Sequence, residues 1–220
     1  VVLWAADGVP ISTAAHDQTF PTITTDRVGG AIITWQDFRG GTNWDVYAQR
    51  VNALGAVQWT PDGVPISAAG DKQISSLITS DGAGGAIITW LDFRSGTNYD
   101  IYAQRINIAG TVQWTADGLP ISTAANNQFL YRMTSDGAGG AIIAWQDYRS
   151  SATSDIYAQH VDHKGYLGTI APALSAVRDV SPDQGGKLSV AWQRMNHDAD
   201  GKQLITYYSV WRGMDPGAAF

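Results

Sequence analysis

The chain has 220 residues, of which 44% are hydrophobic and 15% charged, and its formal net charge at pH 7 is −6. An acidic chain lacks the basic surface that binds nucleic acid, and no apolar run approaches the roughly 18 residues of a membrane span. Cysteine is absent, which excludes disulfides, thiolate nucleophiles and thiolate metal sites.

The chain begins at Val1 and not at methionine. Its first residues have neither the basic stretch nor the length of a signal peptide. We therefore expect a mature, trimmed or internal piece of a longer protein.

One residue pattern, W-x-D-x-R followed by D-[VI]-Y-A-Q-[RH], occurs three times along the chain. Each copy follows the last after 55 positions, so the array repeats one structural unit. The pattern opens at Trp35, Trp90 and Trp145, and its tyrosines are Tyr47, Tyr102 and Tyr157. A period of this length, made of short strand-like runs, is typical of propeller blades.

Within the first copy, strand-like runs cover residues 21–26, 31–37 and 45–52. A fourth run at 56–59 follows a short turn, and glycine-rich turns join the runs as tight hairpins require. Four antiparallel strands in each repeat predict one propeller blade. The stretch at 62–67 also repeats, and we expect it to lead from the outer edge of one blade to the inner strand of the next.

The run at 31–37 carries apolar residues on both faces, as a sheet covered on both sides does. The sequence thus predicts an all-β fold with three four-stranded blades, at about 12–59, 67–114 and 122–168. A β-sandwich and a β-solenoid are the alternatives. Because propellers have about 4 to 8 blades, we expect these three to belong to a larger ring.

The run from Thr79 to Trp90, continued by Asp100 to Arg105, resembles propeller-like repeats of bacterial secreted and cell-surface proteins. The resemblance covers residues 1 to about 168. It implies an exported bacterial protein, located outside the cell or on its surface, and it assigns no activity. The repeat differs in spacing from the sialidase Asp-box S-x-D-x-G-x-x-W, so it does not indicate a glycosidase.

The repeat ends after Gly165, and Thr169 stands where the earlier copies have tryptophan. Strand-like runs at 174–180, 187–192 and 204–212 follow, and together they resemble the opening of a fibronectin type III domain. Such a sandwich has seven strands in about 100 residues. We therefore predict a partial module at 169–220 and a protein that continues beyond Phe220.

The most chemical-looking feature is a group of two aspartates and one arginine in each repeat. Paired carboxylates serve glycosidases as acid and base. An identical group in every blade is better explained as a structural brace, in which the arginine bridges both carboxylates across a loop. The predicted brace residues are Asp37, Arg39 and Asp45; Asp92, Arg94 and Asp100; and Asp147, Arg149 and Asp155.

Aromatic residues offer two further hypotheses. The repeated tryptophans and tyrosines lie at fixed strand positions, where core packing between blades is favoured over a sugar-binding surface. Aromatic rings in exposed loops provide flat stacking surfaces for sugars or protein partners. The candidate ligand-binding residues are Phe38, Trp44, Phe93, Tyr99 and Tyr148.

No residue pattern indicates a metal or a cofactor. His160 and His163 are three apart on a strand and point to opposite faces. Residues 196–201 match half of a calcium loop, but Tyr207 stands where the loop needs a bidentate glutamate. We therefore predict no metal, no cofactor and no catalytic residue.

The sequence favours a non-catalytic scaffold, adhesion or protein-interaction segment of a large exported bacterial protein. The alternative is an accessory region of an extracellular hydrolase, which could bind a glycan, and a third hypothesis is a propeller enzyme with its site at the ring centre. The open faces of three blades need covering. The expected partners are further blades of the same polypeptide, a second copy, or another protein.

Overall fold

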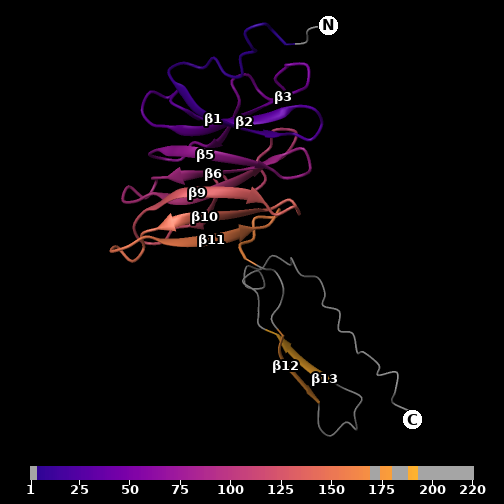
Figure 1. Cartoon of the computed structure of the whole chain (residues 1–220), viewed down its shortest axis with the longest axis vertical. Helices are drawn as coiled ribbons and strands as arrows, with labels where there is room; N and C mark the ends of the chain where they lie inside the picture. Colours follow the sequence, from indigo (N-terminus) through magenta and orange to yellow (C-terminus); the bar gives the residue numbers. More distant parts are fainter. Residues whose placement is uncertain (1–3, 169–173, 180–187, 193–220) are drawn as a thin grey trace, which may run out of the picture. The chain divides into compact units, whose positions relative to one another are not determined.

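The computed structural model describes residues 4–168, 174–179 and 188–192. Contacts divide the chain into two units, Val1–Gly168 and Thr169–Phe220. The fold is all-β, as predicted, and consists of antiparallel sheets that stay open (Figure 1). In the described part of the chain, no helix is long and apolar enough to cross a membrane.

The first unit contains three sheets, one for each sequence repeat. The first sheet has the order β1 (Gln18–Thr25), β2 (Ala31–Asp37), β3 (Asp45–Val51) and β4 (Val64–Ser67). The second has the order β5 (Gln73–Ser80), β6 (Ala86–Asp92), β7 (Asp100–Ile106) and β8 (Leu119–Ser122). The third contains β9 (Gln128–Ser135), β10 (Ala141–Asp147) and β11 (Asp155–Val161).

The fourth strand of each complete sheet is not the one that the sequence predicts. Residues 56–59 make only an isolated bridge, between Val57 and Val51, and the stretch taken for a connector forms the strand β4. The Gln49 side chain explains this, because it accepts from the Trp59 backbone nitrogen at 3.0 Å and donates to the Thr60 oxygen at 2.8 Å. A side chain thus takes the place of a partner strand.

The blade boundaries shift accordingly, to sheets at 18–67, 73–122 and 128–161. The third sheet has three strands among the described residues, where four are expected. Residues 174–177 lie one repeat after the fourth strand of the second sheet, Leu119–Ser122. They belong to β12 (Leu174–Asp179), which pairs with β13 (Leu188–Trp192) and not with β11.

Tight hairpins join the first and second strands of each sheet. Asp81 accepts hydrogen bonds from the backbone nitrogens of Ala83 and Gly85 and closes the turn. A Cβ at Gly85 would lie 2.2 Å from the Ile106 backbone oxygen, so the close approach of β6 and β7 requires glycine here.

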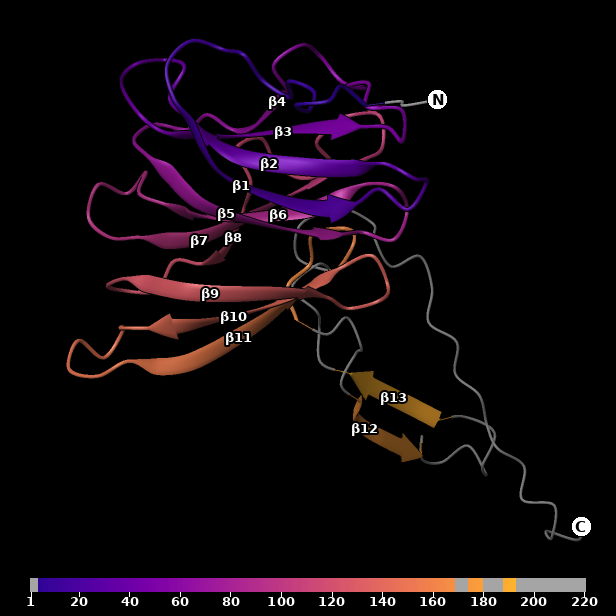
Figure 2. The ribbon, with the colours of Figure 1, turned by 45° about the horizontal axis from the view of Figure 1, so that its top comes forward.

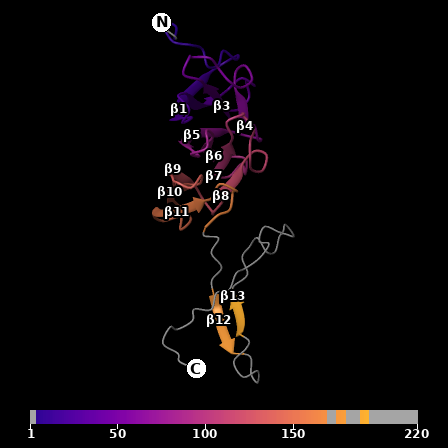
Figure 3. The ribbon, with the colours of Figure 1, turned by 90° about the vertical axis from the view of Figure 1, so that its right-hand side faces the viewer.

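The three sheets stack face to face in chain order (Figures 2 and 3). They meet most closely through their first strands, since β1 contacts β5 and β5 contacts β9, whereas the fourth strands β4 and β8 make no comparable contact among the described residues. One apolar cluster lies between the first and second sheets and another between the second and third. Every residue of β6 is buried, which confirms that both faces of this strand are covered.

The described part of the second unit is the antiparallel pair β12 and β13, at two of the three strand positions predicted there. The third predicted strand, at 204–212, lies outside the described residues, as does the calcium-like stretch at 196–201. The fibronectin type III assignment therefore stays a prediction.

Candidate functional site

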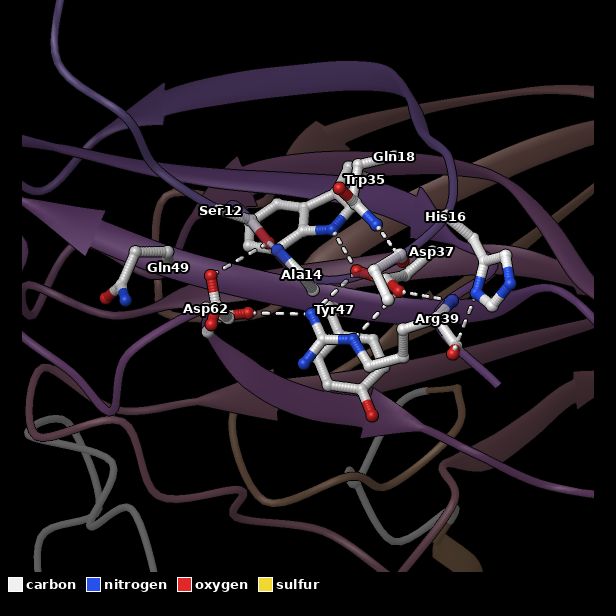
Figure 4. A network of polar contacts seen from close by, with 12 residues as sticks. Ser12, Ala14, His16, Gln18, Trp35, Asp37, Arg39, Tyr47, Gln49 and Asp62 are labelled. Carbon is white, nitrogen blue, oxygen red and sulfur yellow. Dashed lines mark hydrogen bonds and ion pairs between the residues drawn. The ribbon is translucent and has the colours of Figure 1, made fainter. Parts of the chain in front are cut away.

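The repeated tryptophan, aspartate, arginine and tyrosine converge at the end of the second strand of each sheet. In the first sheet, fully buried Asp37 accepts a hydrogen bond from the Trp35 indole at 2.7 Å (Figure 4). The Arg39 guanidinium donates to both Asp37 oxygens, from Nε at 2.8 Å and from Nη2 at 2.6 Å. Its Cζ lies 3.7 Å from the centre of the Tyr47 ring, and Nη2 also donates to the Asp62 backbone oxygen at 2.8 Å. Arg39 thus ties the end of β2 to the turn before β4.

The same arrangement recurs in the other two sheets. Each indole donates to its aspartate at 2.8 Å, and each arginine makes the two-pronged contact and covers its tyrosine. The residues are Trp90, Asp92, Arg94 and Tyr102 in the second sheet, and Trp145, Asp147, Arg149 and Tyr157 in the third. All three tryptophans are buried, as expected for core residues.

The second aspartate of each repeat differs from the expected bridge. Asp45 accepts a hydrogen bond from Asn43 Nδ2 at 3.1 Å, and Asp100 accepts one from Asn98 Nδ2 at 2.6 Å. The ion pairs of the arginines, among the described residues, go to the first aspartate only. In the first two sheets the Nη2 atom that binds the first aspartate also donates to a backbone oxygen, that of Asp62 or Asp117. Asp155, the third member of the set, is exposed.

In the first repeat these surroundings shift the pKa values of the two carboxyl groups in opposite directions. Burial favours the neutral form of Asp37, but hydrogen bonds from Arg39 and Trp35 outweigh it and hold the pKa of Asp37 below its ordinary value. The Arg149 hydrogen bond lowers the pKa of Asp147 to about 2. Burial, followed by the negative charge of Asp37, raises the pKa of Asp45 to about 6.

A carboxyl group with a pKa near 6, such as Asp45, can exchange a proton near neutral pH, and burial raises the pKa of Asp100 in the same direction. Catalysis would also require a substrate beside it. The three pockets on the first unit that are described below have other linings, and none includes Asp45 or Asp37. The arrangement therefore suits bracing better than acid–base chemistry.

A second repeated ion pair was not recognised in the sequence. In the first hairpin, buried Asp26 accepts from the backbone of Val28 and Gly30 and pairs with Arg50 at 2.8 Å. Asp81 and Arg105 repeat this pair, and Asp136 and His160 take the place in the third sheet. The sequence contained the signal, because the aspartate before each Gly-Gly pair and the basic residue after the repeated glutamine both recur with the period.

His160, on β11, thus pairs with the aspartate of the hairpin between β9 and β10. Its Nε2 lies 2.8 Å from Asp136 Oδ2, and this hydrogen bond raises the pKa of His160 above its ordinary value. Searching the described residues finds no group of three or more histidine, aspartate or glutamate side chains that could hold a metal ion.

The predicted ligand-binding aromatics lie in the loops between second and third strands, and they pack against one another. Phe38 contacts Trp44, and Phe93 contacts Tyr99, each with ring centres 5.0 Å apart. The Lys72 ammonium lies 5.0 Å from the centre of the Phe93 ring. These four rings are half-buried, so they are less available for stacking than loop positions suggested.

Phe129, on β9, was missed by the sequence analysis and extends this cluster. It lies 5.5 Å from Tyr99 and 6.3 Å from Tyr148, measured between ring centres. Phe129 and Tyr148 line a pocket of about 260 Å³ with Asn126, Asn127 and Ser151. Tyr148 is thus the predicted ligand residue that borders open space.

A second pocket, of about 410 Å³, lies between the second and third sheets and shares Phe129 and Tyr148. Exposed Arg132 and half-buried Gln146 add polar groups to it, and the Ser75 backbone contributes a carbonyl that the buried Tyr131 hydroxyl already occupies. A related pocket of about 470 Å³ lies between the first two sheets, around exposed Phe20. Each of these two pockets lies beside a β-bulge in the first strand of a sheet. The bulges contain Phe20 in β1 and Ser75 in β5, which have φ of 53° and 57°. Such bulges re-aim side chains next to sites, and no local sequence pattern announces them.

Comparison with known proteins adds little. No protein-family model matches the chain, and no curated protein matches it. Among solved structures, the crystal structure of endo-arabinase from Bacteroides thetaiotaomicron VPI-5482 is similar, with 13% sequence identity and a TM-score of 0.47 over 83% of this chain and 72% of that chain. A likeness at this level supports no transfer of fold or activity.

Proposed function

We propose that residues 1–168 are blades of a β-propeller and serve as a non-catalytic scaffold or protein-interaction segment of a large exported bacterial protein. The convergence of the sheets at β1, β5 and β9 supports the blade arrangement, because blades meet at their inner strands around an axis. The location, outside the cell or on its surface, rests on the resemblance of the repeats.

The observation that carries the proposal is the identical use of the carboxylates in all three sheets. Asp37, Asp92 and Asp147 are fully buried, and each is held by an indole and an arginine. A charge-assisted two-pronged pair of this kind positions a backbone with high specificity. An active site needs one accessible group, whereas a repeated fold needs the same brace in every copy.

Interaction is supported by the open side of the third sheet. Ile142 and Ile156 are 44% and 75% exposed there, although the matching residues of the second sheet, Ile87 and Ile101, are fully buried. Large exposed apolar residues grouped on one face mark a surface that another molecule covers.

A second candidate function is glycan binding by an accessory region. The pocket at Phe129 and Tyr148 favours it, because two aromatic rings border the amide side chains of Asn126 and Asn127. Rings stack on sugar faces, and amides pair with hydroxyl groups.

Incubation of the full chain with a panel of polysaccharides tests the non-catalytic proposal. We expect no release of reducing ends. Release that Asp45→Asn abolishes would overturn the proposal and assign catalysis to the poised carboxyl group. Binding to a glycan array that Tyr148→Ala removes and Phe93→Ala keeps would establish the second candidate, since Phe93 occupies the same position in the second repeat but lines none of these pockets.

A further inference from the structure

Among the described residues, the edge strand β11 of the third sheet has no partner strand like β4 and β8 in the other two sheets. Ala48 on β3 pairs with Val64, Ala103 on β7 pairs with Leu119, and both alanines are fully buried. Ala158 occupies the same position on β11 and is exposed. An unpaired strand edge of this kind is a template for another strand.

A strand of the matching sequence lies unused near the start of the chain. Residues 9–12 read V-P-I-S, as Val64–Ser67 do, and Leu119–Ser122 differ only in the first residue. Ile66 and Ile121 are 2% and 5% exposed in β4 and β8, whereas Ile11 is half-buried and its segment pairs with no strand among the described residues.

The contacts of this segment place it where the last strand of a preceding sheet would lie. The Trp59 indole of the first sheet donates to the Ile108 backbone oxygen of the second at 3.0 Å, and Trp4 donates to the Ala53 oxygen at the same distance. The backbone nitrogen of Ala68 donates to Asp117 at 3.0 Å, and that of Thr13 donates to Asp62 at 2.6 Å. Residues 4–13 therefore dock on the first sheet as 59–68 dock on the second.

One chain cannot bring the spare strand to the vacant edge. The segment contacts the first sheet, and the second sheet separates the first from the third (Figures 1 and 2). The residues one repeat beyond β8, 174–177, pair with β13.

We propose that a second copy of this chain completes the third sheet: residues 9–12 of one copy add to β11 of the other, head to tail. The registers of β4 and β8 place Ser12 opposite Ile156, Pro10 opposite Tyr157 and Val9 opposite Ala158. The exchange is reciprocal, so two copies bring six sheets together. Six sheets fall within the roughly 4 to 8 blades that close a ring. This inference rests on the proposed blade arrangement and names the partner of its open face.

The two faces that would meet in the dimer correspond to faces that already meet twice within one chain, between the first and second sheets and between the second and third. The side of the first sheet that faces the second carries Ile32, Val46 and Ala48, all fully buried, and the third sheet carries Ile142, Ile156 and Ala158 at the same positions. The second sheet contributes Ile88, Trp90 and Ile106 to its interface with the first sheet. The corresponding residues of the first sheet are Ile33, Trp35 and Val51. The new interface thus continues an established one.

Sedimentation of the full chain tests the proposal. We expect a particle with twice the mass of one chain, and Ile156→Lys to weaken it by roughly tenfold or more because a charge would be buried in the interface. The matched control is Leu54→Lys, which replaces a residue that is 57% exposed and whose counterpart in the third repeat is Lys164. This control should leave the dimer intact.

A disulfide test reports on the strand register itself, since the chain has no cysteine of its own. Val9→Cys with Ala158→Cys should yield a dimer that resists denaturant until it is reduced, because directly opposite residues lie within disulfide reach. Val64→Cys with Ala48→Cys is the matched pair inside one chain and should give a cross-linked monomer. Each single variant should remain uncross-linked.

A full chain that is monomeric at every concentration would overturn the second-copy proposal, and so would a ladder of larger particles, which indicates open head-to-tail growth. Either result leaves the non-catalytic proposal intact, because only turnover of a substrate contradicts it.

Discussion

At the scale of single residues, Asp37 and Asp45 lie eight positions apart and are driven in opposite directions by their neighbours. Arg39 and Trp35 stabilise the ionised form of Asp37, whereas burial and the Asp37 charge disfavour the ionised form of Asp45. The same pattern in every repeat predicted that these residues act as a unit. The pattern did not reveal that the arginine pairs with the first carboxylate alone and also donates to the Asp62 backbone oxygen.

The Asp45 shift predicts a pH-dependent stability. Because its pKa is raised to about 6, the stability that its neutral form provides is fully present below the ordinary value of 3.8 and is lost as the pH rises through about 6. Asp45→Asn removes this loss and keeps the acceptor for Asn43, so the variant should melt higher than the parent at pH 7.5. After allowance for solvent screening, the gain should be on the order of 1 kcal/mol.

Asp37→Asn is the matched variant, and the sign reverses. A lowered pKa gives stability that is present above the ordinary value of 3.8 and lost as the pH falls through the folded value. The variant should therefore cost about 1–3 kcal/mol at pH 7.5, because Arg39 loses its charged partner. Thermal melts of both variants at pH 7.5 provide the check, and shifts of equal sign would contradict this account.

At the scale of strands and turns, the fourth strand of the first and second sheets follows a glycine that approaches the buried tryptophan closely. A Cβ at Gly118 would lie 2.4 Å from the Trp90 ring, and the residue has φ of 90°. This turn leads directly into β8, which begins at Leu119. The sequence showed the Asp-Gly pair at 62–63 and 117–118 but not that the glycine packs against an indole.

Gly118→Ala should therefore destabilise the chain by about 1–3 kcal/mol more than Gly137→Ala does. Gly137 has φ of 79° and no atom within 4 Å of its added Cβ, so it carries the backbone strain without the clash. Denaturant unfolding of the two variants isolates the packing term. Equal losses would show that the indole moves aside freely.

At the scale of the whole molecule, the three sheets share one sequence pattern but differ in their surroundings. All residues of β6 are buried by the neighbouring sheets of the same chain, whereas β11 has only one residue fully buried. We expect the amides of β6 to exchange slowest with solvent at every protein concentration. Exchange in β11 should be fast in dilute solution and slow as copies associate.

Hydrogen exchange followed by mass spectrometry provides the measurement. Exchange in β6 that is as fast as in β11 under dilute conditions would contradict the burial of the second sheet. A β11 rate that is independent of concentration would count against strand exchange and not against the fold.

The sequence alone was enough to determine the period, the all-β class and the hairpin turns, because each depends on residues within one repeat. The recurrence of the tryptophans at one strand position also predicted their packing between sheets. The location of the fourth strand, the single-carboxylate ion pair and the bulges beside Phe20 and Ser75 were decided by tertiary structure. The first two depend on side chains that reach residues 10 or more positions away: Gln49 binds the backbone of Trp59 and Thr60, and Arg39 binds that of Asp62. Ile101 and Ile156 occupy the same position in two repeats, yet Ile101 is buried and Ile156 is exposed. Only the side of the sheet that carries Ile101 is covered by a neighbouring sheet of the chain.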